Sequence, residues 1–175
     1  GVLDISAEKY AVYRQVREDS LYLDEKMMER IAELRKTYKV AILSNFTPDL
    51  RHKIEHVWQN ADQFDEIVIS CEVGLLKPDP AIYELILKRL EIQADETVFV
   101  DDRVVNIEAA EKAGLHTVLF EHRKQGLKAL DAILAAQAER GTQHKKSILI
   151  FGFKNLILIL LGTIRTTSTP FHPIM

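Results

Sequence analysis

Apolar residues recur along the first part of the chain in two alternating patterns, one typical of helices and one typical of strands. Met27, Ile31, Leu34 and Tyr38 are spaced three or four residues apart, which places them on one face of a helix. This helix is predicted to start near Asp24. Residues 40–43 then form a short, continuous apolar run, as a strand buried on both faces of a parallel sheet does.

The alternation repeats to about residue 137. Strands that alternate with amphipathic helices are typical of an α/β protein. We therefore predict a three-layer, Rossmann-like parallel sheet with helices on both faces. The predicted strands are 40–43, 66–70, 97–100 and 116–120, and the predicted helices are 7–18, one from Asp24, one after Thr47, one from Asp79, 104–113 and 124–137.

The helix after Thr47 has a distinct start signal. Thr47 is expected to be the N-cap, because its hydroxyl can accept a hydrogen bond from a free N–H group of the first turn. Pro48 would then be the first helical residue, a position that proline tolerates. Leu50, Ile54 and Val57 are predicted to form the apolar face of this helix.

Composition narrows the class of protein. With 47% hydrophobic and 28% charged residues, the chain is expected to fold as a globular domain. Its net charge of −3 provides no basic excess that would attract a nucleic acid. The single cysteine excludes an internal disulfide and is typical of a reducing compartment, so we expect a cytoplasmic protein.

Charge is distributed unevenly along the chain. Residues 1–140 carry a formal net charge of −7, whereas residues 141–175 contain no Asp or Glu and carry +4. A change of composition on this scale is typical of a boundary. We therefore predict a boundary near Gly141, with residues 141–175 forming an apolar, acid-free tail of uncertain origin.

The tail contains two apolar runs, 148–153 and 156–161, separated by Lys154-Asn155. Membrane contact through residues 147–164 is disfavoured, because a span needs about 20 apolar residues and a central Lys-Asn pair is costly in a bilayer. A β-hairpin that turns at Lys154-Asn155 is a second interpretation. The composition favours a third, the translation of an unrelated reading frame after about residue 140.

Polar residues suited to a phosphate and a metal stand at three strand ends, and such ends meet at one edge of a parallel sheet. Asp101-Asp102 follow the third strand. Two adjacent carboxylates repel each other unless a cation compensates, and Mg²⁺ is typically held by one or two carboxylates with phosphate oxygens. Alternatively, one carboxylate caps the next helix and the other is solvated. Asn106 is predicted to brace this loop or to face solvent.

Two further segments add groups that bind anions. Lys77 lies between Gly74 and Pro78 in a stiff turn, so its ammonium could be held in place to stabilise a transferring phosphoryl group. The alternative is an ordinary surface lysine. Ser44 and Asn45 supply a hydroxyl, an amide and backbone N–H groups near a helix start, where anions are favoured, although they could also serve as a helix cap.

Taken together, these segments resemble the haloacid dehalogenase-like hydrolase superfamily, and most closely the branch whose helical cap is inserted early in the chain. "AILSNFTPD" resembles its second motif, "EVGLLKPDPAIYELIL" its third and "VFVDDRVVNIEAAEKAGLHTVLF" its fourth, within a likeness that covers roughly residues 5–137. The resemblance implies that Ser44 and Asn45 bind the phosphoryl group and that Lys77 stabilises it. It also implies that Asp101 and Asp102 hold Mg²⁺.

The implied reaction is Mg²⁺-dependent hydrolysis of a small phosphorylated metabolite through an aspartyl-phosphate. In the family, the nucleophile and the general acid–base lie in an Asp-x-Asp motif after the first strand, and this pattern does not occur in the sequence. We therefore expect residues 1–20 to be a cap remnant, residues 21–140 a partial core, and the chain alone to be inactive. The alternatives are a haloacid dehalogenase, which needs no metal, and a non-catalytic module that binds phosphate or a partner.

The family's first strand is central in the sheet, between the strands that here end at Ser44 and Asp101. Without it, two inner edges would expose backbone groups that lack partners. We therefore expect the isolated chain to be unstable, to aggregate, or to close the gap by a non-native pairing.

Overall fold

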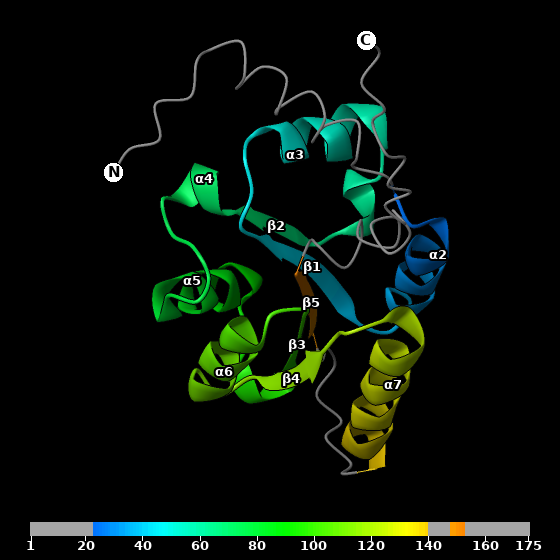
Figure 1. Ribbon diagram of the computed structural model, residues 1–175. Coiled ribbons are helices and arrows are strands. Elements are labelled where there is room, and N and C mark those ends of the chain that lie inside the picture. The colour runs from blue at the N-terminus through cyan, green and yellow to red at the C-terminus, as the bar shows by residue number, and fades with distance from the viewer. Residues whose placement is uncertain (1–22, 140–147, 153–175) are drawn as a thin grey trace, which may run out of the picture.

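A parallel five-stranded sheet forms the centre of the protein (Figure 1). The computed structural model describes residues 23–139 and 148–152. All strand pairs are parallel, in the order β2-β1-β5-β3-β4. The strands are β1 (Lys39–Ser44), β2 (Glu66–Ile69), β3 (Thr97–Asp101), β4 (His116–Leu119) and β5 (Ile148–Gly152).

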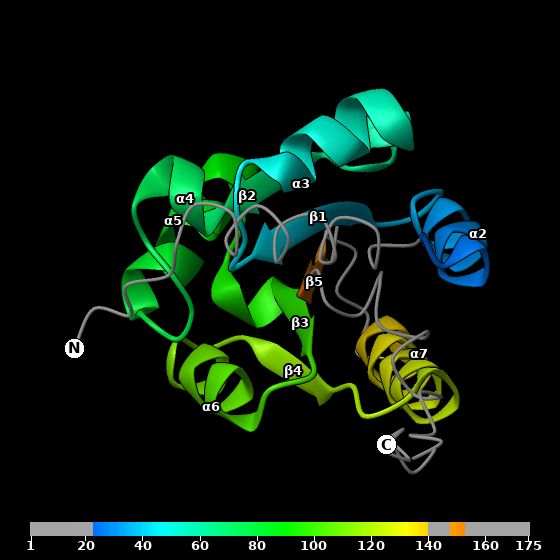
Figure 2. The same cartoon turned by 45° about the horizontal axis from the view of Figure 1, so that its top comes forward.

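Helices cover both faces of this sheet, which confirms the predicted three-layer α/β fold. Figures 1 and 2 show α5 and α6 on one face and α2 and α7 on the other. The predicted helix over 7–18, and with it the predicted cap remnant, lies outside the described residues. The helices are α2 (Glu25–Leu34), α3 (Asp49–His52), the π-helical η1 (Lys53–Val57), η2 (Ala61–Gln63), α4 (Ser70–Val73), α5 (Pro80–Leu90), η3 (Ala94–Glu96), α6 (Val104–Lys112) and α7 (Arg123–Glu139).

Two hydrophobic layers pack the helices against the sheet. One includes residues of α2, α3 and α7, and the other includes residues of α5 and α6. Side chains of β1 alternate between them, with Val40 and Ile42 in the first layer and Ala41 and Leu43 in the second. All four are fully buried, as expected for an interior strand of a parallel sheet.

The predicted start of α2 is confirmed, and so are three of the four residues predicted for its inward face. Asp24 is the N-cap, and its carboxylate accepts a hydrogen bond from the Met27 backbone N–H at 3.3 Å. Met27, Ile31 and Leu34 are buried, whereas Tyr38 is half-buried and lies outside the helix, because α2 ends at Leu34. Asp24 also pairs with Arg123 at 2.9 Å, which ties the start of α2 to the start of α7.

The helix after Thr47 differs from its prediction in two details. It begins at Asp49, so Pro48 stands at the cap instead of the first helical position. Leu50 and Ile54 are buried, but Val57 is 57% exposed. The reason is that the chain widens to a π-helix over Lys53–Val57, so that the last turn no longer follows the angular spacing of an α-helix.

The central position of the sheet is occupied by β5, which follows all the other strands in the sequence. Lys39–Leu43 of β1 pair with Ile148–Gly152 on one side, and Thr97–Val100 of β3 pair with Ile148–Phe151 on the other. The inner edges of β1 and β3 are therefore paired, so the gap is closed by a segment beyond the composition boundary.

The other interpretations of the tail concern positions that are mostly outside the described residues. Lys154-Asn155, where a hairpin would turn, is among them. Across 23–139 and 148–152, no helix is long and apolar enough to span a bilayer.

Gly126, in α7, lies against the ring of Phe120. A Cβ at position 126 would come within 3.0 Å of three carbons of this buried ring. We expect Gly126→Ala to lower the free energy of unfolding in urea by about 1–3 kcal/mol, because an overpacked core must shift. The exposed Lys124→Ala on the same helix should change it by less than about 0.5 kcal/mol. A Gly126→Ala variant as stable as the parent chain would contradict this packing.

Candidate active site

The carboxyl ends of β1, β5 and β3 lie side by side and bring the predicted polar residues to one edge of the sheet. Ser44 ends β1, Asp101 ends β3 and Gly152 ends β5. Ser44 and Asp101 are both buried, as is Lys77 from the loop between α4 and α5. Three of the predicted site residues thus lie in the interior at this edge, where few water molecules compete for their charges.

Lys77 spans the two halves of this edge. Its Nζ donates one hydrogen bond to the Leu43 carbonyl of β1 and another to Asp101 Oδ2 of β3, each at 2.7 Å. The side chains of Lys77 and Asp101 are only 4% and 2% exposed. The ammonium and carboxylate therefore form a buried ion pair, and the alternative of an ordinary surface lysine is wrong.

The loop that carries Lys77 is fixed at both ends. Gly74 ends α4 with a φ of +70°, a backbone conformation that glycine adopts without strain. Asp79 caps α5, where its carboxylate accepts from the Ala81 N–H at 2.9 Å. These two ends hold the short segment that presents Lys77.

Between Gly74 and Asp79, the Asn45 side chain holds the backbone of Lys77 with two hydrogen bonds. Its Nδ2 donates to the Lys77 carbonyl at 2.7 Å, and its Oδ1 accepts from the Lys77 N–H at 2.8 Å. Both ends of the amide are thus used inside the protein. In this structure the Asn45 side chain positions Lys77, a contact that the sequence analysis did not anticipate.

Asp101 is held from its other side by the start of α6. Its Oδ1 accepts from the Arg103 N–H at 2.9 Å and from Asn106 Nδ2 at 2.8 Å. The contact predicted between Asn106 and the acidic loop is therefore present. Asn106 Oδ1 is also buried, and it finds no donor among the described residues. An amide oxygen of this kind can accept from a water molecule or bind a hard cation.

Burial and pairing act on Lys77 in opposite directions. Burial disfavours the ammonium and lowers the pKa of Lys77, while the negative charge and hydrogen bond of Asp101 oppose this shift. Burial also raises the pKa of the neighbouring Tyr83, with a smaller contribution from Asp101. The Tyr83 phenol is thus kept protonated and donates to the Asn106 carbonyl at 3.0 Å.

The donor set at this edge fits a magnesium ion. Asp101 and Asp102 are consecutive acids at the end of β3. The buried Asn106 Oδ1, which has no donor among the described residues, is a third hard oxygen beside Asp101. Among the described residues, no three His, Cys, Asp or Glu side chains gather as metal ligands. Mg²⁺ does not need such a cage, because it usually keeps several water molecules and takes one or two carboxylates with phosphate oxygens.

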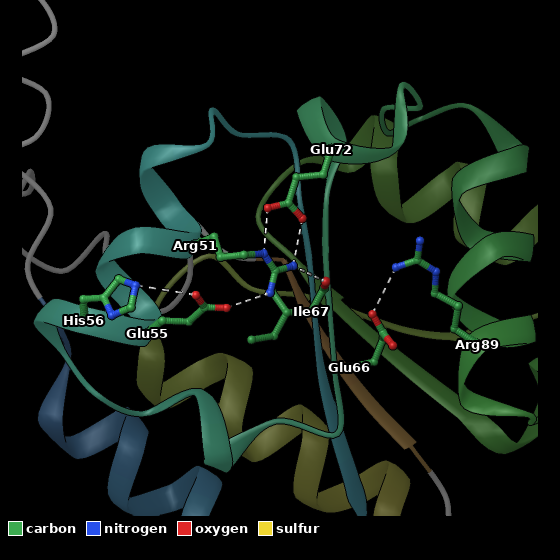
Figure 3. A network of polar contacts seen from close by, with 7 residues as sticks. All are labelled: Arg51, Glu55, His56, Glu66, Ile67, Glu72 and Arg89. Carbon is green, nitrogen blue, oxygen red and sulfur yellow. Dashed lines mark hydrogen bonds and ion pairs between the residues drawn. The ribbon is translucent and has the colours of Figure 1, made fainter.

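Arg51 of α3 organises a network beside this edge that the sequence analysis did not predict (Figure 3). Its guanidinium donates to both Glu72 oxygens, at 2.6 and 2.8 Å, and to the Ile67 carbonyl at 2.8 Å. The hydrogen bond to Glu72 is the main reason why the pKa of Arg51 is raised. Glu72 lies in α4, so Arg51 ties α3 to the segment that leads to Lys77. No local pattern marks a pair 21 residues apart.

Comparison with known proteins places this chain in a family. A sequence model described as haloacid dehalogenase-like hydrolase matches residues 3–114. Acyl-CoA dehydrogenase family member 10 of Mus musculus is 32% identical over 123 residues, 70% of this chain and 11% of that protein. Ribulose-1,5-bisphosphate 5-phosphatase of Halopiger xanaduensis is 32% identical over 133 residues, 71% of this chain and 55% of that protein. The chain thus spans well under two thirds of either relative.

A solved structure shares both the fold and part of the sequence. It is a haloacid dehalogenase family enzyme from Bacteroides thetaiotaomicron, crystallised in complex with magnesium and inorganic phosphate. It has a TM-score of 0.50 and 25% identity, over 53% of this chain and 51% of that chain. With a family match that covers more than half of its length, this chain belongs to the haloacid dehalogenase-like hydrolases.

Proposed function

We propose that this chain carries the phosphate- and metal-binding side of a phosphohydrolase active site. The complete site would hydrolyse a phosphomonoester with Mg²⁺ through an aspartyl-phosphate. The observation that carries the proposal is the buried ammonium of Lys77, held between the Leu43 carbonyl and Asp101 next to the end of β1. A fixed positive charge at this edge suits the equatorial oxygens of a transferring phosphoryl group.

The residues at this edge divide into binding and positioning groups. The Ser44 hydroxyl and the Asn45 backbone N–H would bind phosphoryl oxygens, and Lys77 would neutralise their charge. Asp101 and Asp102 would hold Mg²⁺, which lowers the charge on the phosphate when it is bound. The Asn45 side chain would keep Lys77 in place. Asn106 would do the same for Asp101.

The proposed substrate class is a small phosphorylated metabolite, and the proposed location is the cytoplasm. The Halopiger relative is named for a phosphatase activity on a sugar bisphosphate, and the Bacteroides structure contains inorganic phosphate with magnesium. Both support a phosphate ligand. Because the sequence contains no Asp-x-Asp pattern, the chain alone is expected to bind phosphate without hydrolysing a phosphomonoester.

The missing Asp-x-Asp pattern favours one second candidate, a non-catalytic module that uses the same edge to bind phosphate. The two functions predict different results once a carboxylate nucleophile is supplied. A form of the protein with an Asp-x-Asp strand in the sheet should release phosphate from p-nitrophenyl phosphate if the site is that of a phosphatase. Release of halide from a 2-haloacid would instead identify a dehalogenase.

Phosphate binding by the chain itself tests the proposed site directly. We expect the ³¹P NMR signal of inorganic phosphate to broaden on addition of the protein with Mg²⁺, and to recover when EDTA removes the metal. Asp102→Asn should weaken this binding at least about tenfold, since even the outer-shell partners of metal ligands contribute about 10–100-fold to affinity.

Asp95→Asn is the matched control, because it makes the same change of charge at the opposite end of β3. It should leave phosphate binding unchanged. Phosphate binding that is insensitive to both EDTA and Asp102→Asn would refute the proposed metal site.

A further inference from the structure

Gly152 ends β5 beside the Lys77–Asp101 pair. It pairs in register with Leu43 of β1, and the preceding residue pairs with Val100 of β3. A Cβ at position 152 would lie within 3.0 Å of Asp101 Oδ2 and Cγ, and 3.2 Å from Lys77 Nζ. Real Cβ atoms do not approach other atoms this closely, so the Asp101 carboxylate occupies the space that a side chain at 152 would need.

Three hydrogen bonds fix the Asp101 carboxylate in this space. Lys77 binds Oδ2, while the Arg103 N–H and the Asn106 amide bind Oδ1. With glycine at 152, Asp101 is the carboxylate that pairs with the Lys77 ammonium, at 2.7 Å, in the part of the chain that the structure describes. The acid expected to bind a metal is thus the counter-ion of the lysine expected to bind a phosphate.

We propose that position 152 determines which carboxylate pairs with Lys77. With glycine there, Asp101 fills the vacant space and neutralises the ammonium, so less of its negative charge is left for a cation. A carboxylate on residue 152 would replace Asp101 beside Lys77 and release Asp101 for a cation. The metal part of this inference rests on the proposed function, whereas the exchange of partners at Lys77 does not.

A larger side chain at position 152 and a negative charge at position 152 are expected to change the stability of the protein in opposite directions. The exchange of carboxylates beside Lys77 can therefore be tested. If glycine is needed only for space, a larger side chain destabilises the protein whatever its charge. If this space must instead hold a carboxylate that pairs with Lys77, a carboxylate at 152 stabilises a protein from which the Asp101 carboxylate has been removed. Asparagine has nearly the same shape as aspartate but carries no charge, so it is the matched control.

The experiment compares Asp101→Ala alone with Asp101→Ala combined with Gly152→Asp or with Gly152→Asn, by thermal unfolding of the full chain. We expect Gly152→Asp to raise the Tm of the Asp101→Ala protein by about 5 °C or more, and Gly152→Asn to give no increase. If Asp101→Ala is unfolded, the same result appears as recovery of a cooperative melt by Gly152→Asp alone. Equal effects of the two substitutions, or a loss of stability with both, would overturn the exchange.

The release of Asp101 is tested separately in the Gly152→Asp single variant. Isothermal titration with Mg²⁺ is expected to show at least tenfold tighter binding than in the parent chain or in Gly152→Asn. Equal Mg²⁺ affinity in all three would refute the release of Asp101 for a cation. The stability measurements need neither phosphate nor metal, so failure of the proposed phosphate site and failure of the exchange give different results.

Discussion

Replacing Lys77 with methionine is expected to lower the free energy of unfolding by about 3–5 kcal/mol. Methionine fills a similar volume but leaves the Asp101 carboxylate, which is 2% exposed, without its cationic partner. The hydrogen bonds of Arg103 and Asn106 remain, but they do not neutralise its charge. Urea unfolding followed by far-UV circular dichroism measures the difference.

Lys39→Met is the matched control for this substitution. Lys39 is half-buried at the start of β1, and within residues 23–139 and 148–152 its Nζ donates to the Leu90 carbonyl alone, at 3.0 Å. Losing this bond should cost roughly 0.5–1.5 kcal/mol. If Lys39→Met and Lys77→Met were equally harmful, the large effect expected at position 77 could not be attributed to the buried ion pair.

A double variant measures the interaction energy between Lys77 and Asp101 separately from the contribution of each residue. Asp101→Asn removes the charge of the carboxylate and keeps its shape, so Lys77→Met combined with Asp101→Asn leaves no buried charge unpaired. We expect its loss of stability to be smaller than the sum of the two single losses by about 1–3 kcal/mol. Strict additivity would show that the ammonium and carboxylate do not stabilise each other.

A chain that ends at residue 146 is expected to lose cooperative unfolding, because it lacks β5. Five residues of β1 and four of β3 have partners in β5. Removing them exposes two inner edges and divides the sheet into β2-β1 and β3-β4, and a two-stranded piece is marginally stable at best. The expected loss is comparable to the whole stability of a typical domain, about 5–15 kcal/mol.

The control for this truncation is a chain that ends at residue 153, which keeps β5. Far-UV circular dichroism melts, dispersion of the amide NMR signals and gel filtration compare the two chains. The longer chain should melt cooperatively and elute as a compact species, and the shorter one should do neither. Equal melting of the two chains would mean that β5 contributes nothing to the stability of the sheet.

The helices and strands of the main part of the chain could be predicted because their signals are local. Apolar spacing and Asp24 located α2, and the residue pair Asp79-Pro80 located the start of α5. The short helix α4 was missed because it has only four residues and follows β2 directly. Val57 was placed on the wrong side because a π-helical turn leaves no mark in the apolar spacing.

The role of β5 could not be predicted because strand pairing in a parallel sheet is not a local property. Residues 148–152 form a short apolar run that is equally compatible with a strand, a hairpin arm or part of a longer apolar helix. The partners of this run precede it by about 50 and about 110 residues. The change of composition marked the start of the tail. Composition does not show which segment pairs with β1 and β3 at the centre of the sheet.

The sequence predicted that Ser44, Lys77 and Asp101 lie at one edge of the sheet, but it did not predict the contacts between them. Ser44, Lys77 and Asp101 were brought together by motif order and by the rule that strand ends meet at one edge. The sequence does not show that the Asn45 side-chain amide would form two hydrogen bonds with the Lys77 backbone, one as donor and one as acceptor. Nor does it show that Lys77 would pair with Asp101 at 2.7 Å. Such contacts depend on atomic positions that only the folded chain defines.

The central position of β5 also sets the order of events during synthesis. The ribosome delivers β1, β2, β3 and β4 first, at about 5–20 residues per second, and the middle strand last. Until residue 152 has emerged, β1 and β3 cannot both be paired on their inner sides, and an unpaired edge can associate with another nascent chain. The yield of folded protein in cells should therefore depend on chaperones that keep incomplete chains from associating with one another. This holds even if the finished protein is stable.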